Sequence, residues 1–285
     1  MTDAPPLAIT GATGAIGRLT AEELARGGAA LRLLARTPSR APHLPSAVVV
    51  EASYGDRQQA RRALDGVTTL LMISGGEEEG WLEGQLDFVA AAADAGVRHI
   101  VYTSSQGAAA DAEFTYARIH FATEEAIRAS GMAWTILRDS LYLDFLALLP
   151  RADGAILGPG GDGRIAGVAK VDVARSLAAV LRDPAAHAGR VYELTGPEAL
   201  SLDEVAATLS AATGRDIRYV DETLEEARAS REPYGVPEWR MQGWITTYTA
   251  IARGDFARVT GDVELLTGRA PIGLAELTGQ PTSRG

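Results

Sequence analysis

The first half of the chain alternates short apolar runs with amphipathic stretches. The apolar runs have the continuous hydrophobic character of strands that are buried on both faces of a parallel sheet. They lie at Leu7–Thr10, Leu31–Ala35, Ala47–Glu51, Thr69–Ile73, His99–Thr103 and Trp134–Leu137. Between them, the pattern predicts helices over residues 17–26, 57–64, 81–95 and 115–130. This alternation predicts right-handed β–α–β units and an α/β fold with a doubly wound parallel sheet.

The pattern changes after Leu137. Glycine and proline cluster over residues 154–163, which predicts a loop. A helix over residues 171–182 and a strand at Val191–Leu194 are expected next. The remainder is predicted to be mostly helical, and it begins with a capping box at Ser201.

These patterns predict one core with an appended lobe. The core is expected to comprise residues 1–140 together with 171–196. The smaller, mostly helical lobe is expected to comprise residues 141–170 together with 197–285, and to bind substrate. A chain of 285 residues is long for one compact domain and short for two large ones, which agrees with this division.

A glycine-rich turn follows the first predicted strand. The sequence Gly-Ala-Thr-Gly-Ala-Ile-Gly over residues 11–17 joins that strand to a helix. Gly11 suits the tight turn, Gly14 lets the backbone approach a pyrophosphate, and Gly17 lets the helix pack close to the strand. At the first β-to-α turn, this motif predicts a Rossmann-type dinucleotide site. The cofactor residues that the motif itself predicts are Gly11, Gly14 and Gly17.

The end of the second strand indicates which dinucleotide is bound. Sites for NAD carry an acidic residue there for the ribose 2′-hydroxyl, whereas a 2′-phosphate is held by arginine. This chain has Arg36 at that position, with Ser39 and Arg40 close behind and no acidic residue nearby. We therefore expect NADP(H), with NAD(H) less favoured. The alternative is that both arginines are solvated loop residues.

Composition excludes several other classes of function. The 37 acidic residues outnumber the 27 basic ones, and the net charge of −10 argues against a nucleic-acid partner. There is no cysteine, and the four histidines are scattered, so no metal site is expected. The sequence shows no export signal and no apolar run of membrane-spanning length, so a cytoplasmic protein without a membrane partner is expected. Lys170 is the single lysine.

Four segments together resemble the NmrA-like, atypical branch of the short-chain dehydrogenase/reductase superfamily. They are Thr10–Arg18, Tyr102–Ser105, Thr135–Arg138 and Asp172–Ala174. The segments His120–Arg128 and Leu137–Phe145 are most similar to the triphenylmethane reductases and NADPH:quinone oxidoreductases of that branch. The resemblance implies a flavin-independent reductase, monomeric or homodimeric, that passes hydride from NADPH to an aromatic or conjugated small molecule. It also implies that Thr10, Thr13, Ala15 and Ile16 of the glycine-rich turn bind the cofactor together with its glycines and Arg36. The resemblance further extends the cofactor site to Ser74, Gly75 and Thr103, which follow the fourth and fifth strands.

The reacting end departs from the usual pattern of this superfamily. Better-known members carry Tyr-x-x-x-Lys on the helix after the fifth strand, whereas this chain has Tyr116 and His120. His120 is a candidate catalytic and cofactor residue that binds ribose or substrate, or donates a proton near neutral pH. The alternative is a structural histidine paired with Glu124. Tyr116 is a weaker catalytic candidate, for which packing is the stronger interpretation. Tyr142, after the sixth strand, is expected beside the nicotinamide and substrate.

Two other functions remain open at this point. An NmrA-like sensor of the NADP(H) redox state would bind the cofactor without turnover, and the missing Tyr-x-x-x-Lys pair is compatible with it. A sugar-nucleotide epimerase or dehydratase is the second alternative, and the missing lysine partner argues against it. An NADPH-dependent reductase of a small conjugated, electron-poor acceptor, such as a quinone, is the favoured interpretation.

Overall fold

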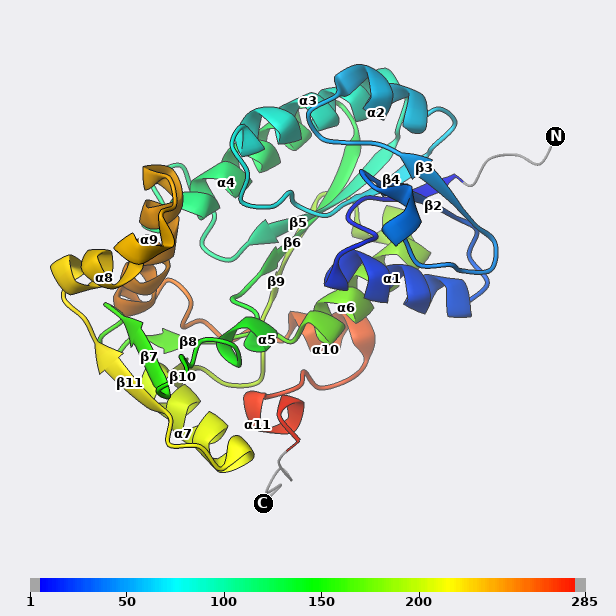
Figure 1. Cartoon of the computed structure of the whole chain (residues 1–285). Helices are drawn as coiled ribbons and strands as arrows, with labels where there is room; N and C mark the ends of the chain where they lie inside the picture. Colours follow the sequence, from blue (N-terminus) through cyan, green and yellow to red (C-terminus); the bar gives the residue numbers. More distant parts are fainter. Residues whose placement is uncertain (1–5, 280–285) are drawn as a thin grey trace. The chain divides into compact units, whose positions relative to one another are not determined.

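The computed structural model describes residues 6–279, and its largest sheet has seven strands (Figure 1). The strand order is β3-β2-β1-β4-β5-β6-β9. The strands are β1 (Leu7–Ile9), β2 (Leu31–Ala35), β3 (Ala47–Glu51), β4 (Thr69–Met72), β5 (His99–Ser105), β6 (Ala133–Asp139) and β9 (Arg190–Leu194). Strand β1 pairs in parallel with β2 and β4, which pair in parallel with β3 and β5. The predicted α/β class and parallel Rossmann-type sheet are confirmed.

Helices cover both faces of this sheet. They are α1 (Ala15–Arg26), α2 (Arg57–Ala63), α3 (Trp81–Asp94), α4 (Thr115–Ala129) and α6 (Lys170–Arg182). Figure 1 shows α2, α3 and α4 on one face and α1 and α6 on the other. Gly96 and Gly131, which lie just after α3 and α4, have φ of +84° and +81°, the left-handed conformation that suits a helix end.

Four short strands lie outside the main sheet. Strand β7 (Ala155–Gly158) pairs in parallel with β11 (Arg218–Asp221), and β8 (Arg164–Ile165) pairs antiparallel with β10 (Leu200–Ser201). The predicted loop over residues 154–163 is therefore wrong at β7, whose apolar residues are largely buried. The remaining helices are α5 (Leu143–Leu146), α7 (Leu202–Thr213), α8 (Leu224–Arg231), α9 (Glu238–Arg253), α10 (Asp262–Thr267), α11 (Leu274–Leu277) and three 3₁₀ turns at Pro38–Arg40, Pro184–His187 and Glu232–Tyr234.

The capping box predicted at Ser201 is confirmed at the start of α7. The hydroxyl of Ser201 accepts a hydrogen bond from the backbone amide of Glu204, and the Glu204 carboxylate accepts one from the backbone amide of Ser201. The two bonds satisfy amides that a helix start otherwise leaves without partners, and they define where α7 begins.

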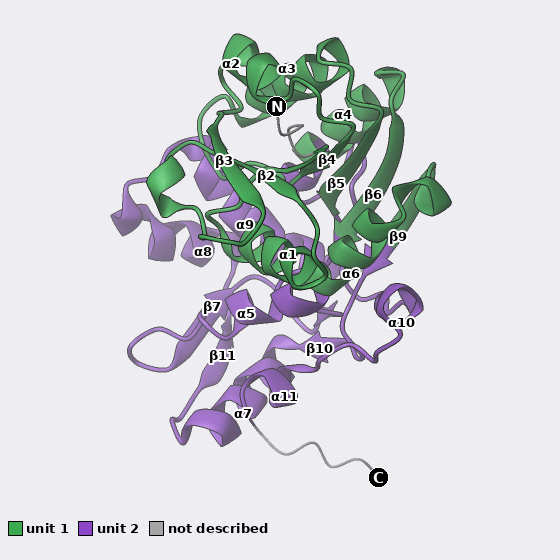
Figure 2. Cartoon of the chain, turned by 90° about the vertical axis from the view of Figure 1, so that its right-hand side faces the viewer, with its two compact units in different colours: residues 1–104, 119–138, 173–192 green, residues 105–118, 139–172, 193–285 purple. Residues whose placement is uncertain are grey.

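The chain divides into two compact units (Figure 2). Unit 1 comprises Met1–Ser104, Ile119–Arg138 and Val173–Tyr192, and unit 2 comprises Ser105–Arg118, Asp139–Asp172 and Glu193–Gly285. The start of the second segment of unit 2 lies next to the boundary expected at residue 140. Residues 105–118, expected in the core, group with unit 2 instead. That the lobe binds substrate stays a prediction.

Each unit has its own apolar core. In unit 1, the sheet and its helices bury Leu70, Phe88 and Ile100 among other side chains. In unit 2, Ile156 and Phe256 are among the buried residues of a second cluster. Within residues 6–279, no helix combines the length and the apolar composition needed to span a lipid bilayer.

A buried ion pair joins helix α4 to strand β6 in unit 1. The fully buried Glu124 carboxylate accepts hydrogen bonds from Nε and Nη2 of Arg138, at 2.8 and 2.7 Å. Arg128 and the hydroxyl of Ser104 donate to the same carboxylate, at 2.9 and 2.6 Å. Burial alone would raise the pKa of Glu124, but the hydrogen bonds from Arg138 and Ser104 and the Arg138 charge hold it below its ordinary value.

This cluster generates a prediction about acid stability. Because the pKa of Glu124 is lowered in the folded protein, its contribution is present above the unfolded pKa of about 4.3 and is lost as the pH falls through the folded value. Glu124→Gln should lower the free energy of unfolding by about 3 kcal/mol near neutral pH. The difference from wild type should narrow as the pH approaches about 4. Urea denaturation across this pH range measures both effects.

Glu125→Gln is the matched control. Glu125 is exposed and pairs only with Arg128 among the described residues, so its substitution should cost less than about 1 kcal/mol. A Glu124→Gln variant as stable as the control would show that the buried pair contributes little.

Candidate functional site

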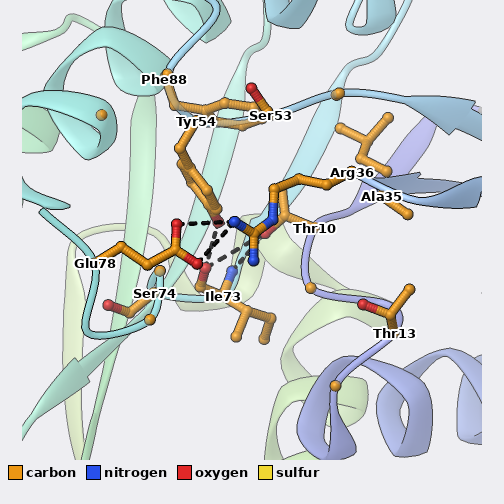
Figure 3. Close-up of a pocket in the computed structure, with 18 of the residues that line it drawn as sticks. Thr10, Thr13, Ala35, Arg36, Ser53, Tyr54, Ile73, Ser74, Glu78 and Phe88 are labelled. Atoms are coloured by element: carbon orange, nitrogen blue, oxygen red, sulfur yellow. Dashed lines mark hydrogen bonds and ion pairs between the residues drawn. The ribbon is translucent and has the colours of Figure 1, made fainter. Parts of the chain in front are cut away.

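A cavity of about 600 Å³ opens at the carboxyl ends of the first four strands of the sheet (Figure 3). The order of strands reverses between β1 and β4, and ligands of open parallel sheets bind at such a point. All of its lining residues belong to unit 1. Seven predicted cofactor residues line it: Thr10, Gly11, Thr13, Gly14, Arg36, Ser74 and Gly75.

The glycine-rich turn has the geometry that a dinucleotide requires. Gly11 has a φ of +61°, and a Cβ on Gly17 would lie 2.3 Å from the carbonyl oxygen of Gly11. Both positions therefore need glycine for the turn itself. A Cβ on Gly14 would approach only one protein atom within 4 Å, at 3.4 Å, so the space beside it is open. The residues present fit a pyrophosphate held at the start of α1.

Thr10 and Tyr54 hold the floor of the cavity together. The backbone amide of Ile73 donates to Oγ1 of Thr10 over 2.8 Å, and the hydroxyl groups of Thr10 and Tyr54 lie 2.7 Å apart. The Tyr54 hydroxyl also donates to the carbonyl oxygen of Ile73. Burial raises the pKa of Tyr54, so its hydroxyl stays protonated. These bonds connect the ends of β1, β3 and β4.

Arg36 lies at the cavity, where the sequence placed it, but an acidic partner accompanies it. Its Nη1 is 2.7 Å from Oε1 and 2.8 Å from Oε2 of Glu78, a residue in the loop between β4 and α3 (Figure 3). The two side chains are 65% and 57% exposed. No acidic residue is near Arg36 in sequence, but the fold supplies one from 42 positions away.

The loop that follows β4 is fixed by side chains behind it. The backbone amide of Ser74 donates to Oγ1 of Thr103 over 2.8 Å, and the amide of Gly75 donates to Oε1 of Gln85 over 3.3 Å. Thr103 is buried and does not line the cavity. Its observed contact is therefore with the loop that carries Ser74.

A series of hydrogen bonds places the proton of His120. Thr123 donates to the carbonyl oxygen of Ile119 over 2.9 Å, so its own oxygen accepts from Nε2 of Gln85, at 3.1 Å. This orientation directs Oε1 of Gln85 toward the Tyr102 hydroxyl, which donates to it over 3.2 Å. The phenol oxygen then accepts from Nδ1 of His120, at 3.1 Å. We assign the proton to Nδ1, which leaves Nε2 as an acceptor.

His120 is uncharged near neutral pH. Burial lowers its pKa to about 4, although the charge of Glu124 acts in the opposite direction. The ring of Trp81, which lines the cavity, meets the imidazole edge-on with 5.6 Å between ring centroids. His120 therefore lies next to the cavity wall, and its Nε2 is suited to accept a hydrogen bond rather than to release a proton.

Tyr116 belongs to unit 2, where packing accounts for it. Its ring atoms lie 2.2 Å from where a Cβ on Gly243 would stand, so this close contact needs glycine. Its ring centroid is 5.3 Å from that of Phe114 and 6.3 Å from that of Trp239. A catalytic role for Tyr116 stays a prediction, with packing as the stronger interpretation.

In unit 2, Tyr142 contacts the buried Asp139 and Lys170, the single lysine. Its hydroxyl donates to Oδ2 of Asp139 over 2.9 Å, and Nζ of Lys170 lies 5.5 Å from its ring centroid. Burial raises the pKa of Asp139 to about 8, although the bond from Tyr142 acts to lower it. The Asp139 carboxyl therefore keeps its proton near neutral pH.

The remaining predicted cofactor residues stand behind the cavity. Ala15, Ile16 and Gly17 form the first turn of α1 and do not line it. Their contribution would be through the start of the helix, whose amides face a bound anion. The structure thus brings the turn residues and Arg36 to one cavity.

Sequence reasoning missed Tyr54, Gln85 and Glu78. Tyr54 follows a strand end closely, which is the place where ligands meet such sheets. Gln85 is a fully buried polar residue of α3, on the helix that also buries Phe88. Both could have been found from these patterns, whereas Glu78 is distinguished only by the fold.

Comparison with known proteins identifies the family of this chain. A family profile described as NAD(P)H-binding matches residues 11–184. Quinone oxidoreductase 2 of Escherichia coli K12 is 35% identical over 277 residues, which cover 95% of this chain and 96% of that protein. NAD(P)H azoreductase of Xenophilus azovorans is 32% identical over 275 residues, which cover 94% and 95%.

Solved structures give the same result. The quinone oxidoreductase of E. coli complexed with NADPH is 30% identical, with a TM-score of 0.87 over 95% of this chain and 98% of that one. The triphenylmethane reductase of Citrobacter sp. complexed with NADP(H) is also 30% identical, with a TM-score of 0.85 and the same coverage. As its motifs predicted, the chain belongs to the NAD(P)H-binding, NmrA-like family of oxidoreductases, in the branch of quinone oxidoreductase 2 and triphenylmethane reductase.

Proposed function

We propose that this protein transfers a hydride from NADPH to a small, conjugated, electron-poor acceptor such as a quinone. The observation that carries the proposal is the position of Arg36 at the cavity behind the glycine-rich turn. Relatives named as quinone, azo-compound and triphenylmethane reductases support this class of acceptor. The nicotinamide cofactor, when bound, supplies the hydride.

The residues of unit 1 bind and orient the cofactor. The turn over residues 11–17 and the start of α1 would hold the pyrophosphate, because backbone amides and the helix dipole favour an anion there. Arg36 would hold the ribose 2′-phosphate by charge-assisted hydrogen bonds. The bonds from Thr10 and Tyr54 keep the cavity floor in place while the ligand binds.

His120 would position the nicotinamide end by accepting a hydrogen bond from a ribose hydroxyl. Its unprotonated Nε2 supports this role, and its low pKa argues against proton donation near neutral pH. It stands where other members of the superfamily carry a lysine that binds the same ribose. His120 would therefore be a positioning residue rather than a general acid.

Reduction of a quinone requires one proton besides the hydride. Asp139 keeps its proton near neutral pH and is hydrogen-bonded to the Tyr142 hydroxyl. This pair supports Tyr142 as a catalytic residue that would transfer its hydroxyl proton to the acceptor oxygen and take the proton of Asp139 in its place. A triarylmethyl cation, which accepts only a hydride, would not need the pair.

Turnover by the purified protein tests the proposal. We expect NADPH consumption with at least one member of a panel of quinones, enones, azo compounds and triarylmethyl cations. Tight NADPH binding without turnover on the whole panel would favour the regulatory alternative. Turnover of a sugar nucleotide alone would favour the epimerase alternative.

The preference for NADPH generates the next prediction. Arg36→Ala should weaken NADPH binding by about 10- to 100-fold, because a charge-assisted hydrogen bond is lost. NADH, which lacks the 2′-phosphate, should lose little. Titration calorimetry measures both affinities. Arg61→Ala, at an exposed arginine of α2 outside the cavity, is the control of equal charge change. Equal affinities of the wild-type protein for NADPH and NADH would contradict the proposal.

The role assigned to His120 makes a prediction of its own. His120→Ala should lower turnover by about tenfold for a quinone and for a triarylmethyl cation alike, because positioning serves both reactions. His120→Gln should restore part of the rate, since its amide oxygen reaches the place of Nε2, whereas Asn reaches only that of Nδ1. Turnover rates of the wild type and both variants with each acceptor, measured at saturating NADPH, test this prediction. A loss confined to the quinone would identify His120 as the proton donor instead.

A further inference from the structure

The Glu78 carboxylate is paired with the Arg36 guanidinium, which is the group that would bind a ribose 2′-phosphate. Both carboxylate oxygens of Glu78 lie within 2.8 Å of Nη1 of Arg36, and Figure 3 shows the carboxylate directed at the guanidinium group. A phosphate is recognised by the same planar set of donors. The carboxylate and the phosphate therefore compete for one guanidinium.

The segment that carries Glu78 is able to move away from Arg36. Glycine stands on either side of it, at Gly76 and Gly80, and Gly80 has a φ of +76°. No atom would lie within 4 Å of a Cβ at either glycine, so neither is packed. Both members of the pair are more than half exposed, which places the pair in the weak class of ionic contacts that a stronger anion can displace.

The charge of the cavity mouth acts in the same direction. Glu78 and Glu79 both line the cavity, so negative charge faces the place where a 2′-phosphate would enter. A 2′-hydroxyl carries no charge and meets no such repulsion. Glu78 therefore weakens the binding of NADPH more than the binding of NADH.

We propose that Glu78 determines the preference between NADPH and NADH by competing with the 2′-phosphate for Arg36. This inference rests on the proposed function, since it requires that Arg36 binds the phosphate. The carboxylate leaves the guanidinium when NADPH binds and can stay when NADH binds. The protein therefore prefers NADPH less strongly than Arg36 alone would allow.

Titration calorimetry with NADPH and NADH tests the inference. Glu78→Gln should tighten NADPH binding by about fivefold and leave NADH within about twofold. Glu83→Gln, which removes an equal charge at an exposed site of α3 outside the cavity, should change neither. In an Arg36→Ala background the gain from Glu78→Gln should shrink to what relief of charge repulsion alone supplies, because there is no guanidinium left to release. The same pattern is expected with 2′,5′-ADP compared with 5′-AMP.

The outcomes separate the two proposals. If Arg36→Ala weakens NADPH but Glu78→Gln does not strengthen it, this inference is wrong and the proposed NADPH preference stands. If Glu78→Gln weakens NADH, then Glu78 is a ligand of the ribose hydroxyl and not a competitor. If Arg36→Ala leaves NADPH binding unchanged with either Glu or Gln at position 78, the proposed role of Arg36 and the competition by Glu78 are both wrong.

Discussion

The cavity at the sheet edge depends on how closely helix α1 approaches the turn that follows β1. At Gly17 the distance leaves no room for a side chain, because a Cβ would meet the carbonyl oxygen of Gly11 at 2.3 Å. This approach directs the start of α1 across the end of the strand and toward the cavity. Any larger residue at Gly17 would push the helix away from the strand. The positions of the turn, of Gly14 and of the first helical amides all follow from this contact.

Around that turn, side chains rather than backbone pairing fix the other walls of the cavity. Thr10, Thr103 and Gln85 each accept a hydrogen bond from a backbone amide of the segment after β4. The three acceptors come from the residue after β1, from β5 and from α3, so the segment is held from several directions. Farther along this segment, Glu78 forms an exposed ion pair with Arg36, which lies after β2 on the other side of the cavity. The cavity thus combines a rigid base with a more loosely held mouth.

Much of the fold and part of the site could be predicted from the sequence, for identifiable physical reasons. Buried parallel strands leave continuous apolar runs, and the glycine-rich turn has strict steric demands that few other residues meet. Strand β7 was missed because glycines and Pro159 surround its apolar residues and its partner β11 lies about 60 residues further on. The pairing of Arg36 with Glu78 was missed because the sequence does not show which segments from different strand ends meet.

The proton on His120 was also beyond sequence reasoning. It follows from the order of donors and acceptors that runs from Ile119 through Gln85 to Tyr102, and this order exists only in the folded chain. The sequence suggested both an acceptor and a donor role for His120. The hydrogen bonds leave Nε2 of His120 as an acceptor, and burial lowers the pKa of the ring, so the acceptor role is favoured.

Because the chain has a single lysine, the surroundings of Tyr142 can be labelled selectively. Lys170 carries the only side-chain amine of the chain, and its Nζ lies over the ring of Tyr142. Amine-directed reagents, which modify many sites on most proteins, would here modify one side chain besides the terminal amine. Reductive methylation with ¹³C-formaldehyde would therefore place a single side-chain NMR reporter beside Tyr142. The shielding of that signal by the aromatic ring would register any ligand that moves the tyrosine.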